Sequence, residues 1–331
     1  MLHCIMRIHI QNPNDDPLFL FSHAQWDAAA DRAGDIARGH EVTLGDTDDE
    51  FAAGMEDAEA LVTELGVMLR LFPCRAPRLR LIFVTSAGLE RLAPYTQLPA
   101  NAVLLNNSGT HSQKAGEFGI MSVLMLAGRV PTLVTNQRGG TWKKQWGTTV
   151  GGKRLVVAGL GGMGAPIARW GRTFGMHVTG VRTVAEPHPD CDDVVTIRDL
   201  DRVLPTTDFL VLACPLTPAT RDMMDRRRLA LLPTGAGLVN MGRGALLDQD
   251  ALCDLLDSGH LSGAVLDVFV PEPIPDGHRL WTTPNLIISP HTSVDEPSSY
   301  NAISLDIFFE NLRAWRDGKP MPNVFDTARG Y

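Results

Sequence analysis

Three polar residues in the second half of the chain have side chains that suit proton and hydride chemistry: Arg243, Glu272 and His291. A histidine titrates near neutral pH and can give or take a proton. A neighbouring carboxylate orients the imidazole ring and stabilises its protonated form. The planar fork of an arginine fits a carboxylate and an adjacent carbonyl together. Reduction of a 2-oxo acid uses such a set, because it takes a hydride from a nicotinamide, a proton for the new alkoxide and a cation for the substrate's charge.

Each of the three residues follows a predicted strand. Six apolar runs predict strands in this half: Leu155–Gly159, His177–Val181, Phe209–Ala213, Gly237–Met241, Ala264–Phe269 and Leu286–Ser289. Arg243, Glu272 and His291 come after the last three of these runs. Ligands of open α/β sheets bind at the carboxyl ends of the strands, so we expect the three side chains to face one cofactor. Singly, each would more often be an ion-pair or cap partner; jointly they favour catalysis.

A glycine-rich turn follows the first of these strands. The apolar run Leu155–Ala158 leads into Gly159, Gly161 and Gly164. The apolar residues that come next recur at helical spacing: Met163, Ile167, Trp170 and Phe174. A strand, a G-x-G-x-x-G turn and a helix predict a dinucleotide site, because the glycines allow a tight turn, backbone approach to a pyrophosphate and close helix packing. The helix N-terminus offers free N–H groups to the phosphates.

The first third of the chain predicts a smaller α/β unit. Strands are expected at Met6–Ile10, Glu41–Leu44, Ala60–Thr63, Leu81–Val84 and Ala102–Leu105. The clearest helix runs from Ser22 to about Arg38. The apolar segment Ala115–Ala127 follows Ser112, a residue type that favours the N-cap, and predicts a buried helix that crosses between domains. Asp248 and Gly259 have the types expected at the two ends of a helix between the fourth and fifth strands of the second unit.

The predicted fold class is α/β, with two doubly wound parallel-sheet domains. One is a Rossmann-type dinucleotide-binding domain and the other a smaller, flavodoxin-like substrate domain. A last predicted helix, Ser298–Asp317, follows the nucleotide unit and is expected to pack back onto the first domain. The substrate domain would then comprise residues 1–107 and 297–331, and the dinucleotide-binding domain residues 108–296. We expect the active site in the cleft between them.

The composition argues against several classes of protein. Of the 331 residues, 44% are hydrophobic and 21% charged, which is typical of a globular protein with room for two cores. The net charge of −8 argues against a nucleic-acid partner, and no apolar run is long enough to predict a membrane-spanning helix. Five scattered cysteines without paired spacing indicate a reducing, cytoplasmic location. No metal site is expected, because His111, His188, His260 and His278 lack ligand spacing and are predicted to be exposed loop residues.

Five motifs together resemble those of the D-2-hydroxyacid dehydrogenase family. They are GLGGMG (159–164), CPLTPAT (214–220), VNMGRGA (239–245), DVFVPEP (267–273) and SPHTS (289–293). The resemblance covers almost the whole chain. It implies that Arg243 binds the substrate, that Glu272 is the partner of the histidine and that His291 is the general acid/base.

The resemblance also implies a substrate loop and an assembly. Backbone N–H groups of the loop Ser86-Ala87-Gly88 would bind the substrate carboxylate, with Ala87 and Gly88 as the contacts. The ending Asp326–Tyr331 is similar to that of a glyoxylate/hydroxypyruvate reductase subgroup. A homodimer built through the nucleotide unit is implied, with Ala115–Ala127 and the Trp142 loop at the interface.

The residue after the second strand of the nucleotide unit bears on the choice of cofactor. Chains that use NAD normally carry Asp or Glu here for the ribose hydroxyls, whereas this chain has Arg182. A guanidinium suits a 2′-phosphate, and Thr183 can add a hydroxyl. Glu186 favours the alternative, NAD, since its carboxylate could reach the ribose hydroxyls if the loop bends back. The sequence therefore favours NADP over NAD.

The motifs supply further residues expected around the cofactor: Gly162, Met163, Cys214, Pro215, Thr220, Met241, Gly242, Asp267 and His291. Asp267 equally suits the ordering of a loop, and Cys214 suits a small apolar spacer rather than a redox group. Trp142 and Trp146 predict packing in a core or an interface, with a part in the substrate pocket as the alternative.

The interpretation that these expectations favour is a reductase of small 2-oxo acids in which His291 donates the proton. One alternative is a related dehydrogenase of another small anion such as phosphite, which the same three residues could serve. A formate enzyme is less expected, because the resemblance implies an amide side chain in that branch at the position where this chain has Glu272. From another class, a nucleotide-sensing protein like the related transcriptional corepressors is possible, although no basic patch or binding tail supports it.

Overall fold

The computed structural model describes residues 5–13 and 20–330, and the chain divides into two compact units. The terminal unit combines the described residues up to Thr110 with those from Glu296 onward, and the central unit is His111–Asp295. The chain therefore passes between the units twice, at 110–111 and at 295–296. Cys4, one of the five cysteines, and Tyr331, the last residue of the ending Asp326–Tyr331, lie outside the described residues.

The terminal unit is built on a five-stranded parallel sheet with the strand order β2-β1-β3-β4-β5, the flavodoxin-like order. Its strands are β1 (Arg7–Gln11), β2 (Glu41–Gly45), β3 (Ala60–Thr63), β4 (Leu81–Val84) and β5 (Val103–Leu105). All five predicted strands are confirmed, with ends that differ by at most one residue. Strands β3 and β4 are buried along their whole length, as expected for parallel strands covered on both faces.

Two pairs of helices cover this sheet. Helices α1 (His23–Ala33) and α10 (Tyr300–Arg316) contribute to the core on one face, and α2 (Asp48–Met55) and α3 (Leu65–Leu71) to the core on the other. The predicted helix from Ser22 to Arg38 forms α1, and its last part is the 3-10 helix η2 (Gly34–Ala37). A further 3-10 helix, η3 (Glu90–Leu92), follows β4.

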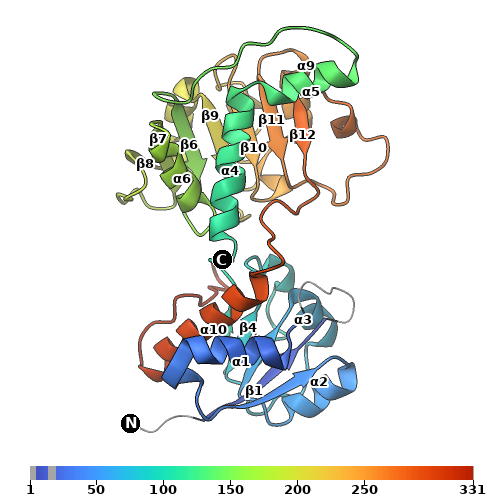
Figure 1. Ribbon diagram of the computed structural model, residues 1–331, viewed down its shortest axis with the longest axis vertical. Coiled ribbons are helices and arrows are strands. Elements are labelled where there is room, and N and C mark those ends of the chain that lie inside the picture. Colours follow the sequence, from blue (N-terminus) through green and yellow to red (C-terminus); the bar gives the residue numbers. More distant parts are fainter. Residues whose placement is uncertain (1–4, 14–19, 331) are drawn as a thin grey trace. The chain divides into compact units, whose positions relative to one another are not determined.

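Helix α10 lies beside α1, although the whole central unit separates the two in the chain (Figure 1). The rings of Trp26 and Phe309 lie 4.9 Å apart between their centroids, and Phe308 packs on Phe83 of β4 at 5.8 Å. At the surface Arg32 and Asp306 form an ion pair of 2.8 Å. Burial of these aromatic rings accounts for the return of the chain to the terminal unit.

The central unit is built on a seven-stranded parallel sheet with the order β12-β11-β10-β9-β6-β7-β8. Its strands are β6 (Arg154–Ala158), β7 (His177–Arg182), β8 (Asp193–Thr196), β9 (Phe209–Leu212), β10 (Gly237–Asn240), β11 (Gly263–Leu266) and β12 (Leu286–Ile288). The order from β8 to β11 is that of the six-stranded Rossmann sheet, and β12 extends it by one strand.

The prediction of six strands in this unit was wrong by one. Strand β8 was missed because it lies at the sheet edge, where its residues are only half-buried or exposed and show no apolar run. Strand β11 is also shorter than the predicted Ala264–Phe269. It ends at Leu266, because the chain then turns so that Asp267 can bond a neighbouring loop.

Helices cover both faces of this sheet. Helices α4 (Ser112–Ala127) and α6 (Gly164–Thr173) contribute to the core on one face, with α5 (Val130–Arg138) packed near β11 and β12. The helices that contribute to the core on the other face are α7 (Leu200–Val203), α8 (Arg226–Leu229) and α9 (Gln249–Asp257). Short 3-10 helices complete the unit: η4 (Ile197–Asp199), η5 (Leu204–Thr206), η6 (Gly244–Leu246) and η7 (Arg279–Trp281).

The predicted caps had different outcomes. Asp248 is the N-cap of α9 and accepts from the backbone N–H of Ala251 at 2.8 Å, and Gly259 follows the helix with φ +72°, as predicted. The assignment of Ser112 as N-cap was wrong. Ser112 is the first residue of α4, and the N-cap is His111, which makes no side-chain cap bond. No single helix among the described residues is long and apolar enough to cross a membrane; α4 and α5 pass only as a pair with a 67° bend.

The prediction of exposed loop histidines was wrong. His111, His188, His260 and His278 are each partly buried, and their rings hydrogen-bond backbone groups of nearby turns. The partners of His188 and His278 lie two residues away, whereas those of His260 and His111 lie 28 and 183 residues away, so a local sequence pattern does not reveal the burial of these rings. Among the described residues, no group of three His, Cys, Asp or Glu side chains could hold a metal ion.

The prediction that Trp142 and Trp146 pack in a core is also wrong. Trp142 is 98% exposed and Trp146 is 81% exposed, on an irregular segment after α5. Trp170 and Phe174 of the predicted helix face are 43% and 42% exposed, so that the apolar stripe of α6 extends beyond the core. An interface role for the Trp142 segment remains a prediction.

Candidate active site

The candidate acid/base pair is formed by His291 and Glu272. His291 Nδ1 lies 2.8 Å from Glu272 Oε2, and Glu272 Oε1 accepts from the backbone N–H of Phe269 at 2.7 Å. The carboxylate is therefore fixed by the backbone as well as by the ring. Because Nδ1 faces Glu272, Nε2 is the ring nitrogen that can exchange a proton with a substrate. Both side chains are partly exposed, at 47% and 36%, so a ligand can reach them.

A buried aspartate orders the loop that carries His291. Asp267, 1% exposed, accepts from the backbone N–H groups of Thr292 and Ser293 at 3.1 Å each and from the Ser293 hydroxyl at 2.6 Å. His291 itself has φ +55°, which is uncommon for a residue other than glycine and needs surroundings that hold it. Of the two roles weighed for Asp267, the structure shows the ordering of this loop.

Arg243 lies in a turn after β10. Its Nη1 donates to the carbonyl of Gly242 at 2.8 Å, and the buried Asn240 donates to the Arg243 carbonyl at 3.0 Å. Strand β10 pairs with β11, and β11 pairs with β12, all in parallel. Arg243, Glu272 and His291 therefore follow three neighbouring strands at the carboxyl edge of one sheet.

The glycine turn joins β6 to α6, and its glycines differ in what the fold demands of them. Gly159 has φ +95°, and a Cβ there would lie 2.7 Å from Cys214 Cα. A Cβ on Gly164 would overlap the carbonyl oxygen of Gly159. A Cβ on Gly161 would meet nothing within 4 Å, so the fold leaves this position open to a ligand. The turn, with the N-terminus of α6 behind it, fits a pyrophosphate.

The other residues expected at the cofactor lie around the same sheet edge. Gly162 and the α6 N-cap Met163 are partly buried within the turn. A Cβ on Gly242 would lie 2.8 Å from the Cys214 carbonyl oxygen, so the turns after β9 and β10 are in contact. Met241 beside it is buried.

The turn after β9 is closed by its own side chains. Thr220 Oγ1 donates to the Pro215 carbonyl at 2.8 Å and accepts from the Thr217 N–H at 2.7 Å. Cys214 is buried with its Sγ 3.6 Å from Met223 Sδ, and burial raises the pKa of its thiol to about 12. Such a thiol is neither a nucleophile nor a redox group at neutral pH.

Arg182 is the last residue of β7 and is partly buried, whereas Thr183 and Glu186 are exposed. Burial, with the nearby Asp190 and Asp192, raises the pKa of the Cys191 thiol to about 11, and the positive charge of Arg182 acts in the opposite direction.

The predicted substrate loop, residues 86–88, follows β4 in the terminal unit. Asn106 Nδ2 donates to the Ala87 carbonyl at 2.9 Å, and the N–H of Asn107 donates to the Ser86 carbonyl at 3.1 Å. Gly88 is partly buried. Asn106 and Asn107 were not predicted as site residues, although two asparagines directly after a buried strand are a signal for side chains that order a turn.

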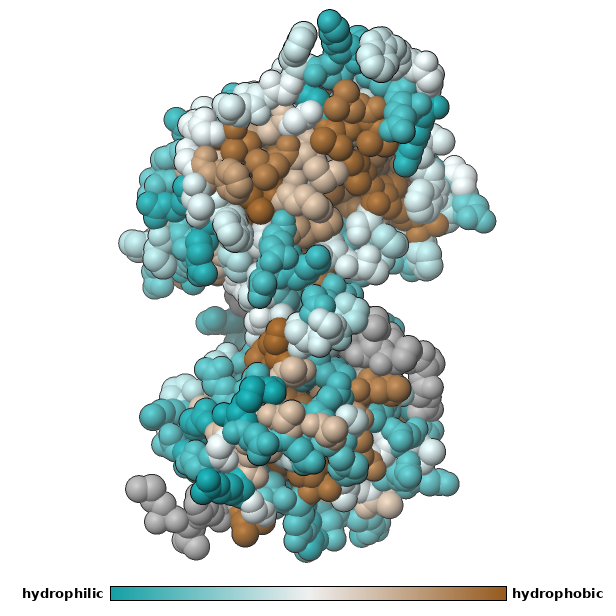
Figure 2. Space-filling view, viewed as in Figure 1, coloured by the Kyte–Doolittle hydropathy of each residue, from teal (hydrophilic) through white to brown (hydrophobic). Residues whose placement is uncertain are grey.

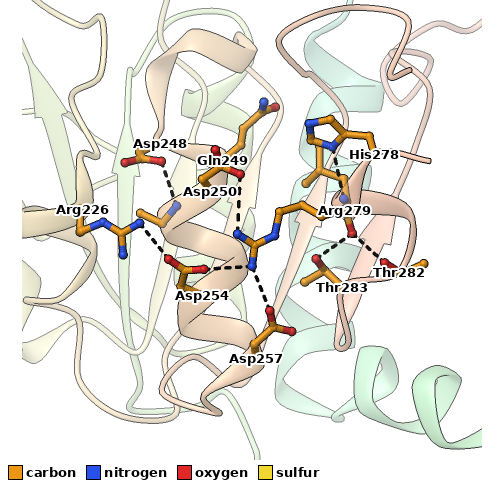
Figure 3. A network of polar contacts seen from close by, with 12 residues as sticks. Arg226, Asp248, Gln249, Asp250, Asp254, Asp257, His278, Arg279, Thr282 and Thr283 are labelled. Carbon is orange, nitrogen blue, oxygen red and sulfur yellow. Dashed lines mark hydrogen bonds and ion pairs between the residues drawn. The ribbon is translucent and has the colours of Figure 1, made fainter. Parts of the chain in front are cut away.

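Helix α9 supports the segments that lead to Glu272 and to β12. Gln249 bonds both backbone groups of Val270, at 2.7 and 3.1 Å. Arg279 lies beside three carboxylates of α9, and Asp254 also binds Arg226 at 2.8 Å (Figure 3). These ion pairs are largely exposed, so each contributes modestly to stability.

The sheet order and the glycine turn together define a dinucleotide-binding α/β protein. The family model "D-isomer specific 2-hydroxyacid dehydrogenase, NAD binding domain" matches residues 120–293. The chain belongs to the D-isomer specific 2-hydroxyacid dehydrogenase family. It is a nicotinamide-dependent oxidoreductase of 2-hydroxy acids, and the predicted family resemblance is confirmed.

Curated relatives and solved structures resemble the chain along most of its length. A glyoxylate reductase of Korarchaeum cryptofilum is 29% identical over 82% of this chain and 83% of that protein. A glyoxylate/hydroxypyruvate reductase B of Pectobacterium carotovorum is 31% identical over 80% and 85%. A D-isomer specific 2-hydroxyacid dehydrogenase of Xanthobacter autotrophicus, solved with NADPH and MES, superposes with a TM-score of 0.81 at 28% identity, over 98% and 100%. The comparisons favour the dehydrogenase over the phosphite and corepressor alternatives.

The different demands on the glycines give a matched pair of variants. Gly161→Ala is expected to fold as the wild type does but to bind the cofactor about 10- to 100-fold more weakly, because a methyl group would stand between the backbone and the pyrophosphate. Gly164→Ala is expected to lower stability by about 1–3 kcal/mol or more, because it forces the turn apart. Thermal unfolding and cofactor titration separate the two effects. Wild-type affinity in Gly161→Ala would contradict the assignment of this turn.

Proposed function

We propose that this protein reduces a small 2-oxo acid of the glyoxylate or hydroxypyruvate type to the 2-hydroxy acid. The observation that carries the proposal is the 2.8 Å pair of His291 and Glu272, which lies at the same carboxyl edge of the dinucleotide-binding sheet as Arg243. The names of the relatives from Korarchaeum and Pectobacterium support the substrate class.

In the proposed mechanism each residue has one task. A bound reduced nicotinamide would supply a hydride for the carbonyl carbon of the substrate. His291 donates its Nε2 proton to the oxygen that becomes the hydroxyl, and Glu272 stabilises the imidazolium until the proton leaves. Arg243 binds the substrate carboxylate and the adjacent oxygen. The N–H groups of Ala87 and Gly88 are proposed to bind the same carboxylate.

The turns after β6, β9 and β10 are proposed to hold the cofactor. Gly161 and the α6 N-terminus are proposed to bind the pyrophosphate, with Gly162 and Met163 in the same turn. The contacting turns of Cys214, Pro215 and Thr220 and of Met241 and Gly242 are proposed to line the rest of the dinucleotide site. For Asp267 the buried bonds to the His291 loop favour a supporting role over a direct contact.

A panel of substrates tests the reaction class. Glyoxylate, hydroxypyruvate, pyruvate and larger 2-oxo acids are offered with NADPH and with NADH, and phosphite and formate with the oxidised cofactors. We expect turnover of the smallest 2-oxo acids. Oxidation of phosphite without reduction of any 2-oxo acid would favour the dehydrogenase of another anion, and cofactor binding without any turnover would favour the sensor.

The role of His291 makes a quantitative prediction. His291→Ala is expected to lower kcat by about 10²- to 10⁴-fold, the usual contribution of a positioned acid, with cofactor affinity nearly intact. Stopped-flow or steady-state assays and a cofactor titration measure the two quantities. As a companion, Glu272→Gln should move the pH–rate profile of reduction to lower pH, because the imidazolium loses its counter-charge. Near-normal turnover of His291→Ala would overturn the proposed mechanism.

NADP is the proposed cofactor. Arg182 at the end of β7 supports it, since this position meets the ribose in Rossmann folds and a guanidinium suits a 2′-phosphate. The relative from Xanthobacter, which was solved with NADPH, also supports it. Thr183 is proposed to add a hydroxyl to the same phosphate.

The preference for NADP is expected to depend on Arg182. A charge-assisted contact contributes about 1.5–3 kcal/mol, so kcat/KM with NADPH should exceed that with NADH by about 10- to 100-fold. Arg182→Asp should reverse the ratio, because it repels the phosphate and accepts from the ribose hydroxyls. Arg202→Asp is the control, because that side chain is 81% exposed on α7 and should leave the ratio unchanged. A wild-type preference for NADH would refute the role of Arg182.

A homodimer through the central unit is proposed as well. Figure 2 shows apolar side chains gathered on the face of this unit where α4 lies. An apolar groove between α4 and α6 is lined by Glu117, Ile120, Met121, Leu124, Met125, Val130, Trp170 and Phe174. Contiguous exposed apolar surface of this kind is typical of an interface, and the exposed Trp142 segment supports the same assignment.

Light scattering tests this assembly. The wild type is expected to have twice the 36.0 kDa mass of one chain at micromolar concentration. Leu124→Glu should give monomers, because it places a charge in the groove. Leu69→Glu, on the exposed side of α3 in the terminal unit, should leave the mass unchanged. A wild-type mass of one chain would refute the dimer.

A further inference from the structure

His111 is the first residue of the central unit, and it contacts the last two residues of the same unit. Its ring is only 14% exposed. Nδ1 donates to the Val294 carbonyl at 3.1 Å and lies 3.8 Å from Asp295 Oδ1. The start of α4 is therefore joined to the segment that directly follows the His291 loop.

This contact gives the loop a second point of attachment. Asp267 bonds the N–H groups of Thr292 and Ser293, and His111 bonds the carbonyl of Val294. Three successive residues after His291 thus have their backbone groups fixed by side chains from β11's end and from the start of α4. The backbone of His291 is in the left-handed region, and such a conformation persists only when neighbouring contacts hold it. Loosening either attachment should therefore displace the imidazole of His291.

The surroundings of His111 oppose a charge on its ring. Burial lowers the pKa of His111, and the positive charges of His291 and Arg243 lower it further, whereas Asp295 and the bond to Val294 act in the opposite direction. The two histidines thus have different environments, since His291 has the Glu272 carboxylate at 2.8 Å.

We propose that His111 is a positioning residue for proton transfer: by binding the Val294 carbonyl it fixes the end of the loop that carries His291. This inference rests on the proposed function, because it assigns the proton to His291. It assigns His111 no contact with the substrate.

Two substitutions separate the hydrogen bond from the ring. His111→Ala removes the donor, and His111→Asn keeps one, since the Asn Nδ2 lies where the His Nδ1 does. We expect His111→Ala to lower kcat about 10- to 100-fold, the effect of a small displacement of a reacting group, with a much smaller change in KM. His111→Asn should recover most of the lost kcat. If His111→Ala keeps wild-type kcat, or if His111→Asn is no better than His111→Ala, the positioning role is wrong.

A second measurement does not need turnover. The titration of the His111 ring is followed by NMR of protein labelled at histidine, with His111→Asn identifying its signal. The pKa of His111 should rise in His291→Asn and in Arg243→Gln, because each removes a positive charge that opposes protonation, and should stay unchanged in Arg202→Gln on α7. An unchanged His111 titration in both site variants would mean that His111 does not face the charges of His291 and Arg243, and would overturn its placement beside the site. Near-normal turnover of His291→Ala would instead overturn the proposed function itself.

Discussion

A buried carboxylate at the end of β11 holds the loop on which the candidate acid/base histidine lies. Asp267 is 1% exposed, and a carboxylate removed from water to this extent is tolerated only when donors replace the water. The N–H groups of Thr292 and Ser293 and the Ser293 hydroxyl are those donors. The requirement is mutual, because the loop conformation that satisfies Asp267 is also the one that gives His291 its positive φ. The position of the imidazole thus follows from the electrostatics of a residue that need not touch a ligand.

The other supports of the site follow the same principle, in which a polar side chain from a regular element fixes the backbone of an irregular segment. Gln249 at the start of α9 bonds the backbone of Val270. The neighbouring residue, Phe269, donates its backbone N–H to Glu272. Asn240 fixes the turn of Arg243 in the same way. Because helices and strands hold these side chains, the loops can be exposed to a ligand without losing their order.

The sequence could predict what depends on local pattern and on parallel topology. Apolar runs identified β9 to β12, and residues that follow neighbouring parallel strands must lie at one edge, so Arg243, Glu272 and His291 were placed correctly at strand ends. Strand β8 was missed because an edge strand has no apolar run. The contact of His111 with Val294 spans 183 residues of chain and has no local signal, so only the folded structure shows it.

The glycine turn shows how a motif can combine two physical reasons. Gly159 and Gly164 are demanded by the fold, since a side chain at either would collide with backbone. Gly161 has no such reason, because its surroundings are open and its φ is accessible to other residues. A glycine costs about 0.5–1 kcal/mol relative to alanine through its greater freedom in the unfolded chain. A position at which the fold does not require glycine and stability disfavours it is therefore best explained by a ligand that must approach the backbone, which supports the proposed pyrophosphate site on evidence independent of the family comparison.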